Sequence, residues 1–509
     1  MNKAFKILAA GAVLAMAASC DLDLVPAGRI TYSPGQQIIN SESDLNSFEA
    51  NILACFRSMD YGVYDIASDV MVDYFNATSD FANNYGSIHR ADETLTAGDY
   101  DTRDNWSNPY AYIKNFNIFI DGAQEVPAEL KEKAAVARGE AYAARAFAYL
   151  HLVRHFAKPY SANANTDLGV PVVVHYEQTA RPARNTVAEV YAQIKTDLDS
   201  AAVLLAGIPG EVRAQKPTVD VVNALYARYY LDIKDYGNAA ASAMKVINTG
   251  KYAVSATAEE MESEWINDNG TEPILQFYAD KQEGTGAHGA YANMGKDPAV
   301  GVYLRPYFIP TKKLAEAYEA GDLRLAQWFN KDQYPSFHVG TYYNEPGNFQ
   351  YYTFVKYFGN PALASDETMP NSTTARKPLL ISEMYLIAAE AYLGAGNAAE
   401  AKTQLNVLQT RRGATATAAT AETIQNEWFR ETVGEGLRMS CLKRWGIGYA
   451  ERTAQDAASA LGVISTGPSY APKSMAASDF HFQWPIPTYD MQTNLNLVQN
   501  EGYAAEVVD

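Results

Sequence analysis

The stretch LLISEMYLIAAEAYLGAGNAAEAKTQLNVLQTRRG, residues 379–413, decides the fold. Apolar residues recur in its first half at helical spacing and form two stripes on different sides of one helix. The first stripe holds Leu380, Met384, Ile387, Ala388 and Ala391, and the second holds Leu379, Leu386 and Leu393. A helix that is apolar on two sides is buried on two sides, so we expect this one inside a stack of helices.

A short turn of small residues follows, and a second helix begins after it. Gly394 and Gly396 are expected to end the first helix. Asn397, with Glu400 three residues later, is typical of a helix N-terminus closed by a capping box. The inner face of the second helix would carry Ala401, Leu405 and Leu408. Together the two helices form an antiparallel hairpin, the unit of a tetratricopeptide-like solenoid.

The same hairpin recurs at residues 218–250, where the turn Gly237-Asn238-Ala239-Ala240 repeats the turn at residues 396–399 in the same register. Two further helical pairs are expected, near residues 127–205 and near residues 423–445. Within the first of them, Thr186 and Glu189 have the spacing of a capping box. Because no hairpin can bury its inner face alone, the rest of the chain must supply further helical pairs.

Residues 252–378 differ from the helical pairs in composition. Glycine, proline and aromatic residues dominate there, and no long helical period persists. Between residues 328 and 358, twelve of thirty-one residues are Phe, Trp or Tyr, against 12% in the whole chain. We therefore expect a large irregular insertion between the second and third helical pairs. Residues 70–104 also lack a period and read as a long ordered loop, and such loops often carry function.

The N-terminus has the form of an export signal. Lys3 and Lys6 precede a short, Ala-rich apolar run at residues 7–18 that is too short to span a bilayer. Small residues stand directly before Cys20, so we predict a lipoprotein signal peptide at residues 1–19 with acylation of Cys20. Residues 20–40 would form a tether, and residues 41–509 a single domain. Ordinary secretory cleavage, with an unmodified Cys20, is the alternative.

The net charge narrows the classes of binding partner. The net charge is −18 and becomes −20 once Lys3 and Lys6 are removed. Such a surface repels a polyanion, so we expect no nucleic-acid partner.

Cys55 and Cys441 are the only cysteines after Cys20. Two buried free thiols are favoured over a disulfide, because Cys441 lies within an apolar helix pattern; export would permit a disulfide.

Five motifs, taken in order, resemble the SusD/RagB family of outer-membrane lipoproteins from Bacteroidetes. They are CDLDLVP at 20–26, ARGEAYAARAFAYLHLVRHFAKPY at 137–160, the hairpin at 381–413, GEGLRMSCLKRWG at 434–446 and WPIPTYDMQTNLNLVQNEGY at 484–503. The chain departs from the family pattern at Ala157, where glycine is usual, at Cys441, where aspartate is usual, and at Glu501, where proline is usual.

The resemblance implies an all-α protein, a tetratricopeptide-like solenoid of four helical-hairpin units with a large irregular ligand-binding insertion. It would be held at the outer-membrane surface by the lipid on Cys20. It implies a SusC-like TonB-dependent transporter as partner, and an oligo- or polysaccharide, less often a peptide, as ligand. The protein would then capture glycan without catalysis, and so would not be an enzyme. No cofactor is expected, and calcium binding is left open.

Sugar binding needs flat ring faces for the C–H side of a pyranose and polar groups for its hydroxyls. Two stretches offer both: residues 74–89, with Tyr74, Phe75, Asn76, Asn83, Asn84, Tyr85 and His89, and residues 288–344, with His288, Tyr291, Asn293, Tyr342, Tyr343 and Asn344. We take eight of these as candidate ligand-binding residues: Tyr74, Asn76, Asn84, Tyr85, Tyr291, Asn293, Tyr342 and Tyr343. For each ring, packing of the insertion onto the helices is the alternative.

Other functions have weaker support in the sequence. His151 and His155 stand four residues apart on a helix, but no HExxH pattern accompanies them, so a solvated or hydrogen-bonded pair is favoured over a metal site. No nucleotide-binding glycine pattern or nucleophile elbow is present. The alternatives that stay open are a peptide-binding RagB-like lipoprotein with the same type of transporter, a surface glycoside hydrolase, and a helical scaffold for protein partners.

Overall fold

The computed structural model describes residues 37–60, 62–282, 291–331, 334–344, 350–364 and 373–504. Cys20, the signal peptide at residues 1–19, most of the tether at residues 20–40, and His288 lie outside the described residues. The predictions made for them therefore stay predictions. Within the described part of the chain, no helix is both long and apolar enough to cross a membrane.

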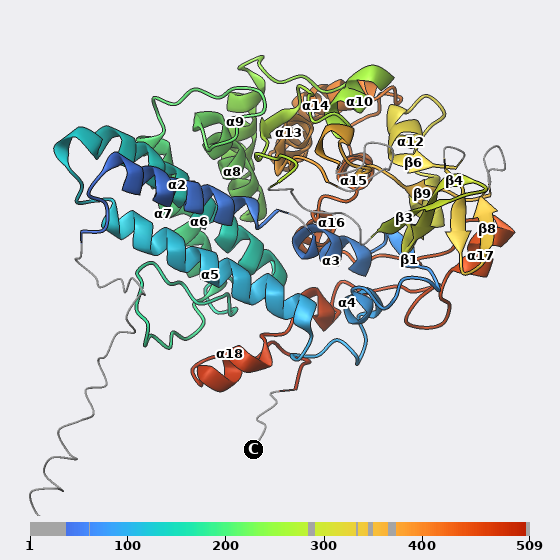
Figure 1. Cartoon of the computed structure of the whole chain (residues 1–509), viewed down its shortest axis with the longest axis horizontal. Coiled ribbons are helices and arrows are strands. Elements are labelled where there is room, and N and C mark those ends of the chain that lie inside the picture. Colours follow the sequence, from blue (N-terminus) through green and yellow to red (C-terminus); the bar gives the residue numbers. More distant parts are fainter. Residues whose placement is uncertain are drawn as a thin grey trace, which may run out of the picture.

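Long helices fill one half of the molecule, at the left and centre of Figure 1, and the helices of all the predicted pairs are among them. Three pairs are in contact: α6 (Lys131–Phe156) with α7 (Val187–Leu204), α8 (Val219–Asp232) with α9 (Tyr236–Ile247), and α13 (Ile381–Gly394) with α14 (Ala398–Arg411). The fourth predicted region holds α15 (Ala421–Glu431), which packs on α13, and α16 (Arg438–Trp445), which packs on α3 (Val63–Met71). The 3₁₀ turn η1 (Ala128–Leu130) leads into α6, and α2 (Glu42–Arg57) and α5 (Tyr100–Gly122) pack against it.

Neighbouring helices pack in an unbroken series. Helix α7 contacts α6 and α8, α8 contacts α9, α9 contacts α13, and α13 contacts α14 and α15. Helix α13 is therefore covered on two sides, as its two apolar stripes predicted. The fold is mainly helical, whereas its description as a tetratricopeptide-like solenoid stays a prediction.

Local sequence signals place the helix ends. The Thr186 hydroxyl accepts a hydrogen bond from the Glu189 backbone N–H at 3.2 Å, and the Glu189 carboxylate accepts one from the Thr186 N–H at 2.8 Å. The predicted capping box is thus confirmed. The Asn397 side chain accepts from the Glu400 N–H at 3.2 Å. Gly396 has a φ of +83°, a left-handed conformation that glycine adopts without steric cost.

An all-α class is too simple for the insertion, which carries strands at the right of Figure 1. One sheet has four strands in the order β3 (Ala292–Asp297), β4 (Gly301–Pro306), β7 (Ser336–His338) and β8 (Thr341–Asn344). Three two-stranded pairs join β1 (Phe75–Ala77) to β5 (Phe308–Pro310), β2 (Pro273–Leu275) to β10 (Leu379–Leu380), and β6 (Phe329–Asn330) to β9 (Thr353–Phe354). These strands are too short for their alternation to stand out in a sequence rich in glycine and proline.

Short helices complete the insertion and the regions read as loops. They are α3 (Val63–Met71), α4 (Gly86–Arg90), α10 (Ala258–Trp265), α11 (Lys312–Ala315), α12 (Leu323–Trp328), η2 (Pro361–Leu363), α17 (Ala458–Val463), η3 (Phe480–Phe482) and α18 (Thr488–Thr493). Residues 70–104 thus hold the end of α3, all of β1 and α4, and the start of α5, rather than one long loop.

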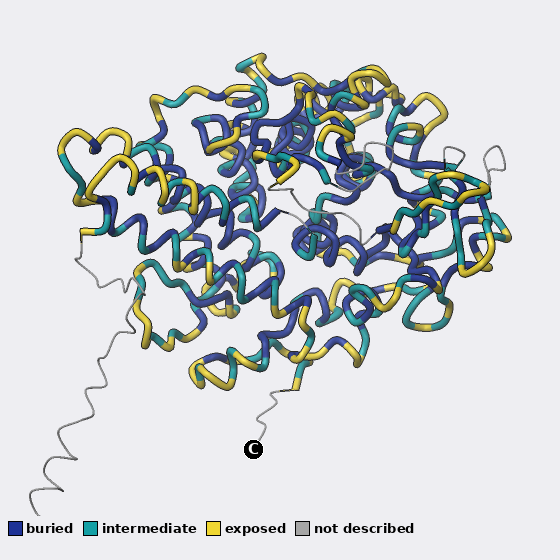
Figure 2. Tube along the Cα trace, in the orientation of Figure 1, coloured by how far each residue is buried: buried dark blue, intermediate teal, exposed yellow. Residues whose placement is uncertain are grey.

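One hydrophobic cluster runs through the helices and into the insertion, with members from Ile39 to Leu497. Figure 2 shows its buried backbone at the centre of the molecule, with exposed segments at the rim. A second, smaller cluster includes Ile309, Tyr351 and Val463. Cys55 and Cys441 are both buried and free, which confirms the prediction of two free thiols.

Candidate ligand-binding site

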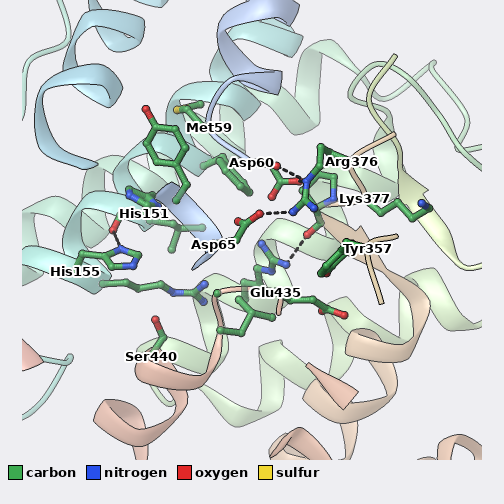
Figure 3. A pocket seen from close by; sticks show the side chains of 18 of the residues that line it. Met59, Asp60, Asp65, His151, His155, Tyr357, Arg376, Lys377, Glu435 and Ser440 are labelled. Atoms are coloured by element: carbon green, nitrogen blue, oxygen red, sulfur yellow. Dashed lines mark hydrogen bonds and ion pairs between the residues drawn. The ribbon is translucent and has the colours of Figure 1, made fainter. Parts of the chain in front are cut away.

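A central cavity of about 60 Å³ lies where α3 and α6 meet the insertion (Figure 3). Arg376 pairs with the Asp65 carboxylate and donates its Nε–H to the Asp60 carbonyl oxygen. Burial raises the pKa of both carboxyls. Such a volume holds roughly four water molecules, whereas ligand pockets usually measure about 300–1,000 Å³. The cavity is therefore too small to be a saccharide site.

Two histidines stand at one edge of this cavity. His151 Nε2 lies 3.0 Å from the Asn105 side-chain oxygen, and His155 Nδ1 lies 2.7 Å from the His151 carbonyl oxygen. The rings are 4.2 Å apart, centroid to centroid. This is the hydrogen-bonded pair that the sequence favoured. Burial, and for His155 also the neighbouring His151, lowers the pKa of both rings, to about 3 for His151.

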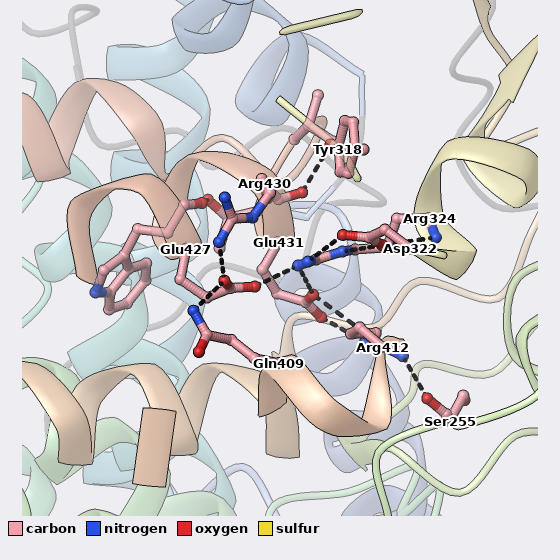
Figure 4. Close-up of polar contacts among 12 residues, drawn as sticks. Ser255, Tyr318, Asp322, Arg324, Gln409, Arg412, Glu427, Arg430 and Glu431 are labelled. Carbon is pink, nitrogen blue, oxygen red and sulfur yellow. Dashed lines mark hydrogen bonds and ion pairs between the residues drawn. The ribbon is translucent and has the colours of Figure 1, made fainter. Parts of the chain in front are cut away.

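A buried ionic network fixes the insertion to the helices (Figure 4). Arg324 on α12 pairs with Glu427 on α15 at 2.7 Å, and Arg412 pairs with Glu431 at 2.5 Å. Arg412 also pairs with Glu272, just before β2, at 2.7 Å. All five side chains are at most 1% exposed. Loss of one partner would leave a charge buried without compensation, which costs about 3–5 kcal/mol. The network therefore opposes separation of α12 and the residues before β2 from the helices.

The outer part of the insertion begins with the hairpin β3–β4. Its strands pair antiparallel from Ala292 opposite Pro306 to Asp297 opposite Gly301. The Asp297 side chain closes the turn by accepting the backbone N–H groups of Ala299 at 2.8 Å and Val300 at 3.3 Å. Gly301 has a φ of +77°. An aspartate that bonds its own backbone, followed by a left-handed glycine, is a stable way to reverse the chain.

A second hairpin, β7–β8, extends the sheet. Strand β7 runs parallel to β4, with Leu304 opposite Ser336, and it pairs antiparallel with β8. Phe337 stands directly opposite Tyr342 across this hairpin. Directly opposed residues lie on the same face of a sheet and pack against each other.

Three half-buried rings gather on one face of this sheet, and we call them the aromatic cluster: Tyr303, Phe337 and Tyr342. Ring centroids are 5.3 Å apart for Tyr303 and Phe337, 5.2 Å for Phe337 and Tyr342, and 6.1 Å for Tyr303 and Tyr342. The ring planes meet at 50°, 62° and 76°, respectively. The cluster thus presents partly exposed rings in several orientations.

Gly295 gives Tyr303 its position. These two residues are paired across β3 and β4, and a Cβ at Gly295 would come within 2.4 Å of the Tyr303 ring. The ring therefore lies over the glycine backbone. Asn293, two residues earlier on β3, is exposed and stands opposite Arg305. Because residues two apart share a face, Asn293 and Arg305 flank the cluster with hydrogen-bonding groups. Arg305 is itself held by Asp80 at 3.3 Å.

Tyr343, unlike Tyr342, is not part of the aromatic cluster. It packs against the second hydrophobic cluster, 3.8 Å from the position of a Cβ on Gly462, and its ring lies 5.6 Å from that of His338. The structure thus brings Asn293 and Tyr342 together on one face and sets Tyr343 against the interior. Asn84 and Tyr85 are half-buried and directly precede α4 in the chain.

Three candidate residues are in the wrong place for a ligand. Tyr74 is 0%, Asn76 1% and Tyr291 2% exposed. Tyr74 packs against the Phe429 ring, Tyr291 packs against Phe75, and the Asn76 amide donates to the Thr453 carbonyl oxygen at 3.1 Å. A sugar cannot reach these side chains, so the packing alternative describes them and they leave the candidate set.

Two members of the aromatic cluster were missed. Phe337 lies in the aromatic-rich stretch at residues 328–358, but Tyr303 lies outside it. No local signal marked Tyr303, because Val302, Tyr303, Leu304 and Arg305 do not alternate between apolar and polar residues. Only the pairing of β4 with β7, which joins distant segments, brings Tyr303 to Phe337.

Comparisons with known proteins agree with the motifs. The family described as "SusD family" matches residues 227–503, more than half of the chain, and the family described as "Starch-binding associating with outer membrane" matches residues 30–231. The starch-binding protein SusD of Bacteroides thetaiotaomicron is 32% identical over 125 residues, which cover 24% of this chain and 20% of that protein. The match thus spans about a fifth of the curated relative.

Solved structures show the same fold over almost the whole chain. A SusD superfamily protein from Bacteroides thetaiotaomicron has a TM-score of 0.72 at 22% identity, covering 90% of this chain and 99% of the other. The surface glycan-binding protein A from Bacteroides fluxus has a TM-score of 0.68 at 19% identity, covering 91% of this chain and 100% of the other. With the family match over more than half its length, this chain belongs to the SusD family.

Proposed function

We propose that the protein is a non-catalytic, surface glycan-binding protein that holds an oligo- or polysaccharide on the outer face of its four-stranded sheet. The observation that carries this proposal is the aromatic cluster of Tyr303, Phe337 and Tyr342, half-buried and flanked by Asn293 and Arg305. Ring faces receive the C–H side of a sugar, and amide and guanidinium groups receive its hydroxyls.

Two relatives support the choice of ligand class. One is by name a starch-binding protein and the other a surface glycan-binding protein. In the finer proposal, acylated Cys20 holds the chain at the outer membrane and the glycan passes to a SusC-like TonB-dependent transporter. The helical hairpins would form a tetratricopeptide-like solenoid that carries the sheet. Incorporation of labelled palmitate that is lost in Cys20→Ala would test the anchor, and co-purification of a barrel transporter would test the partner.

The test of glycan binding uses the mature protein in gels that contain polysaccharides of plant, host and microbial origin. We expect at least one polysaccharide to retard the protein, and we expect no reducing ends to be released from it. Tyr303→Ala and Tyr342→Ala should each weaken the retardation. Tyr489→Ala is the matched control, since Tyr489 is 70% exposed and lies on α18, away from the sheet (Figure 1).

Two outcomes would favour the other functions. Release of reducing ends from the bound polymer would identify a glycoside hydrolase. Retention of binding to a glycopeptide after periodate oxidation of its sugar would identify a peptide-binding protein. Failure of every polysaccharide to retard the protein would contradict the proposal.

A further inference from the structure

A groove of about 880 Å³ opens on the helical side of the molecule, between α2, α6 and residues 208–218. This volume is in the range of ligand sites. The described lining includes Asn46, Glu49, Glu140, Lys216 and Gln276, and it contains no aromatic ring. Helices α2 and α6 lie at the left of Figure 1 and the four-stranded sheet at the right, so the groove is separate from the aromatic cluster. Without rings it is poorly suited to stack a sugar.

One buried carboxyl is directed into this groove. Glu140 on α6 is 3% exposed, and its Oε2 atom accepts no hydrogen bond from a donor among the residues that the structure describes. A buried acceptor that receives no hydrogen bond destabilises the free protein, and a ligand that donates to it removes that cost. Burial, and the neighbouring Glu49 carboxylate, raise the pKa of Glu140 to about 8. At neutral pH this carboxyl therefore holds a proton, which it donates in a hydrogen bond to the Glu49 carboxylate.

The basic groups of the groove are already paired. Lys216 forms an ion pair with Glu49, Lys133 forms one with Glu42, and Arg213 donates to the Gly270 carbonyl oxygen at 2.7 Å. None of these basic groups donates to the buried Oε2 atom of Glu140. A group that brings both hydrogen-bond donors and positive charge would complement it, and an ammonium supplies three donors.

We propose that this groove is a second binding site, which receives a lysine side chain presented by a peptide or protein segment, with the ammonium bound between Glu140 and Glu49. The ammonium would fill the open acceptor on Glu140 and displace the proton held there, so binding and proton release would be linked. At about 880 Å³ the groove has room for a few residues on either side of the lysine.

Isothermal titration of the mature protein tests this inference with an end-blocked Ala-Ala-Lys-Ala-Ala peptide at pH 7.0. We expect binding that releases protons, read from the heats in two buffers of different ionisation enthalpy, because a carboxyl with a pKa of about 8 is mostly protonated at this pH. The same peptide with an acetylated lysine should bind at least about tenfold more weakly, since it lacks the charge.

Glu140→Gln should lose both the affinity and the proton release while it keeps its fold, because glutamine matches the neutral carboxyl in shape. Glu132→Gln is the matched control, since Glu132 is exposed on the same helix and undergoes the same chemical substitution. The inference is overturned if the peptide does not bind at 10 mM, if acetylation changes nothing, or if Glu140→Gln binds normally. It is also overturned if only amine-bearing sugars bind. Glycan retardation through Tyr303 and Tyr342 is independent of each of these results.

Discussion

The Asp101 carboxyl should make the protein less stable as the pH rises. Asp101 stands in the first turn of α5 and is 8% exposed. Burial, followed by the charges of Asp99 and Asp104, raises its pKa to about 7. An unfolded chain has an aspartate pKa of about 3.9. The folded value is the higher one, so the stability is fully present below about pH 4 and is lost as the pH rises through about 7.

The size of the effect follows from this difference in pKa. Each pKa unit corresponds to about 1.4 kcal/mol, so about three units cost at most about 4 kcal/mol at pH 8. Partial solvation of the carboxyl and the loss of a favourable contact with the helix dipole reduce the gain expected from Asp101→Asn to about 1–3 kcal/mol at pH 8. At pH 5 the same substitution should raise the free energy of unfolding by about 1 kcal/mol or less, because this pH lies only about one unit above the pKa of the unfolded aspartate.

Urea unfolding followed by tryptophan fluorescence measures this directly. The wild-type protein, Asp101→Asn and the exposed control Glu132→Gln are compared at pH 5 and pH 8. We expect Asp101→Asn to raise the free energy of unfolding, and to raise it more at pH 8 than at pH 5. A variant that is less stable than the wild-type protein at pH 8, or a gain that is the same at both values, would refute the reasoning.

Three further substitutions test other parts of the structure. Arg412→Met leaves the buried Glu272 carboxylate without its cation, while Glu431 keeps Arg324, and should lower the free energy of unfolding by about 3–5 kcal/mol in urea titrations. Gly295→Val puts a side chain into the Tyr303 ring and should weaken glycan retardation in affinity gels while leaving the thermal unfolding midpoint nearly unchanged. The His151 ring has a pKa of about 3 in the folded protein and of about 6.5 in the unfolded chain, so the protein loses stability as the pH falls through 6.5. From pH 7.5 to pH 5 this loss is about 2 kcal/mol, and His151→Gln should abolish it in urea titrations.

The helical part of the fold was predictable because its signals are local. Apolar spacing, a small-residue turn and a capping residue lie within about thirty residues of one another in α13 and α14, and each acts on its own segment. The four-stranded sheet was not predictable for the opposite reason. Strand β4 pairs with β7 across about thirty residues, and strands of three to six residues show too little alternation to be recognised.

The candidate site shows the same division. The composition of the insertion indicated where rings would gather, but not which of them would be buried. Tyr74 and Tyr342 have similar polar neighbours in the sequence, yet Tyr74 reaches Thr432 across 358 residues and is lost to the core. Tyr342 remains at the surface because its strand ends the sheet and its ring meets Phe337 and Tyr303. Burial depends on such long-range contacts, which a local pattern does not contain.

The most direct test of the central claim is the affinity of the double variant Tyr303→Ala, Tyr342→Ala for a polysaccharide that binds the wild-type protein. Two lost ring contacts of about 0.5–1.5 kcal/mol each predict a loss of roughly 5- to 150-fold, with unchanged binding in Tyr489→Ala. If the folded double variant binds that polysaccharide as tightly as the wild-type protein does, the outer face of the sheet is not where the glycan is held.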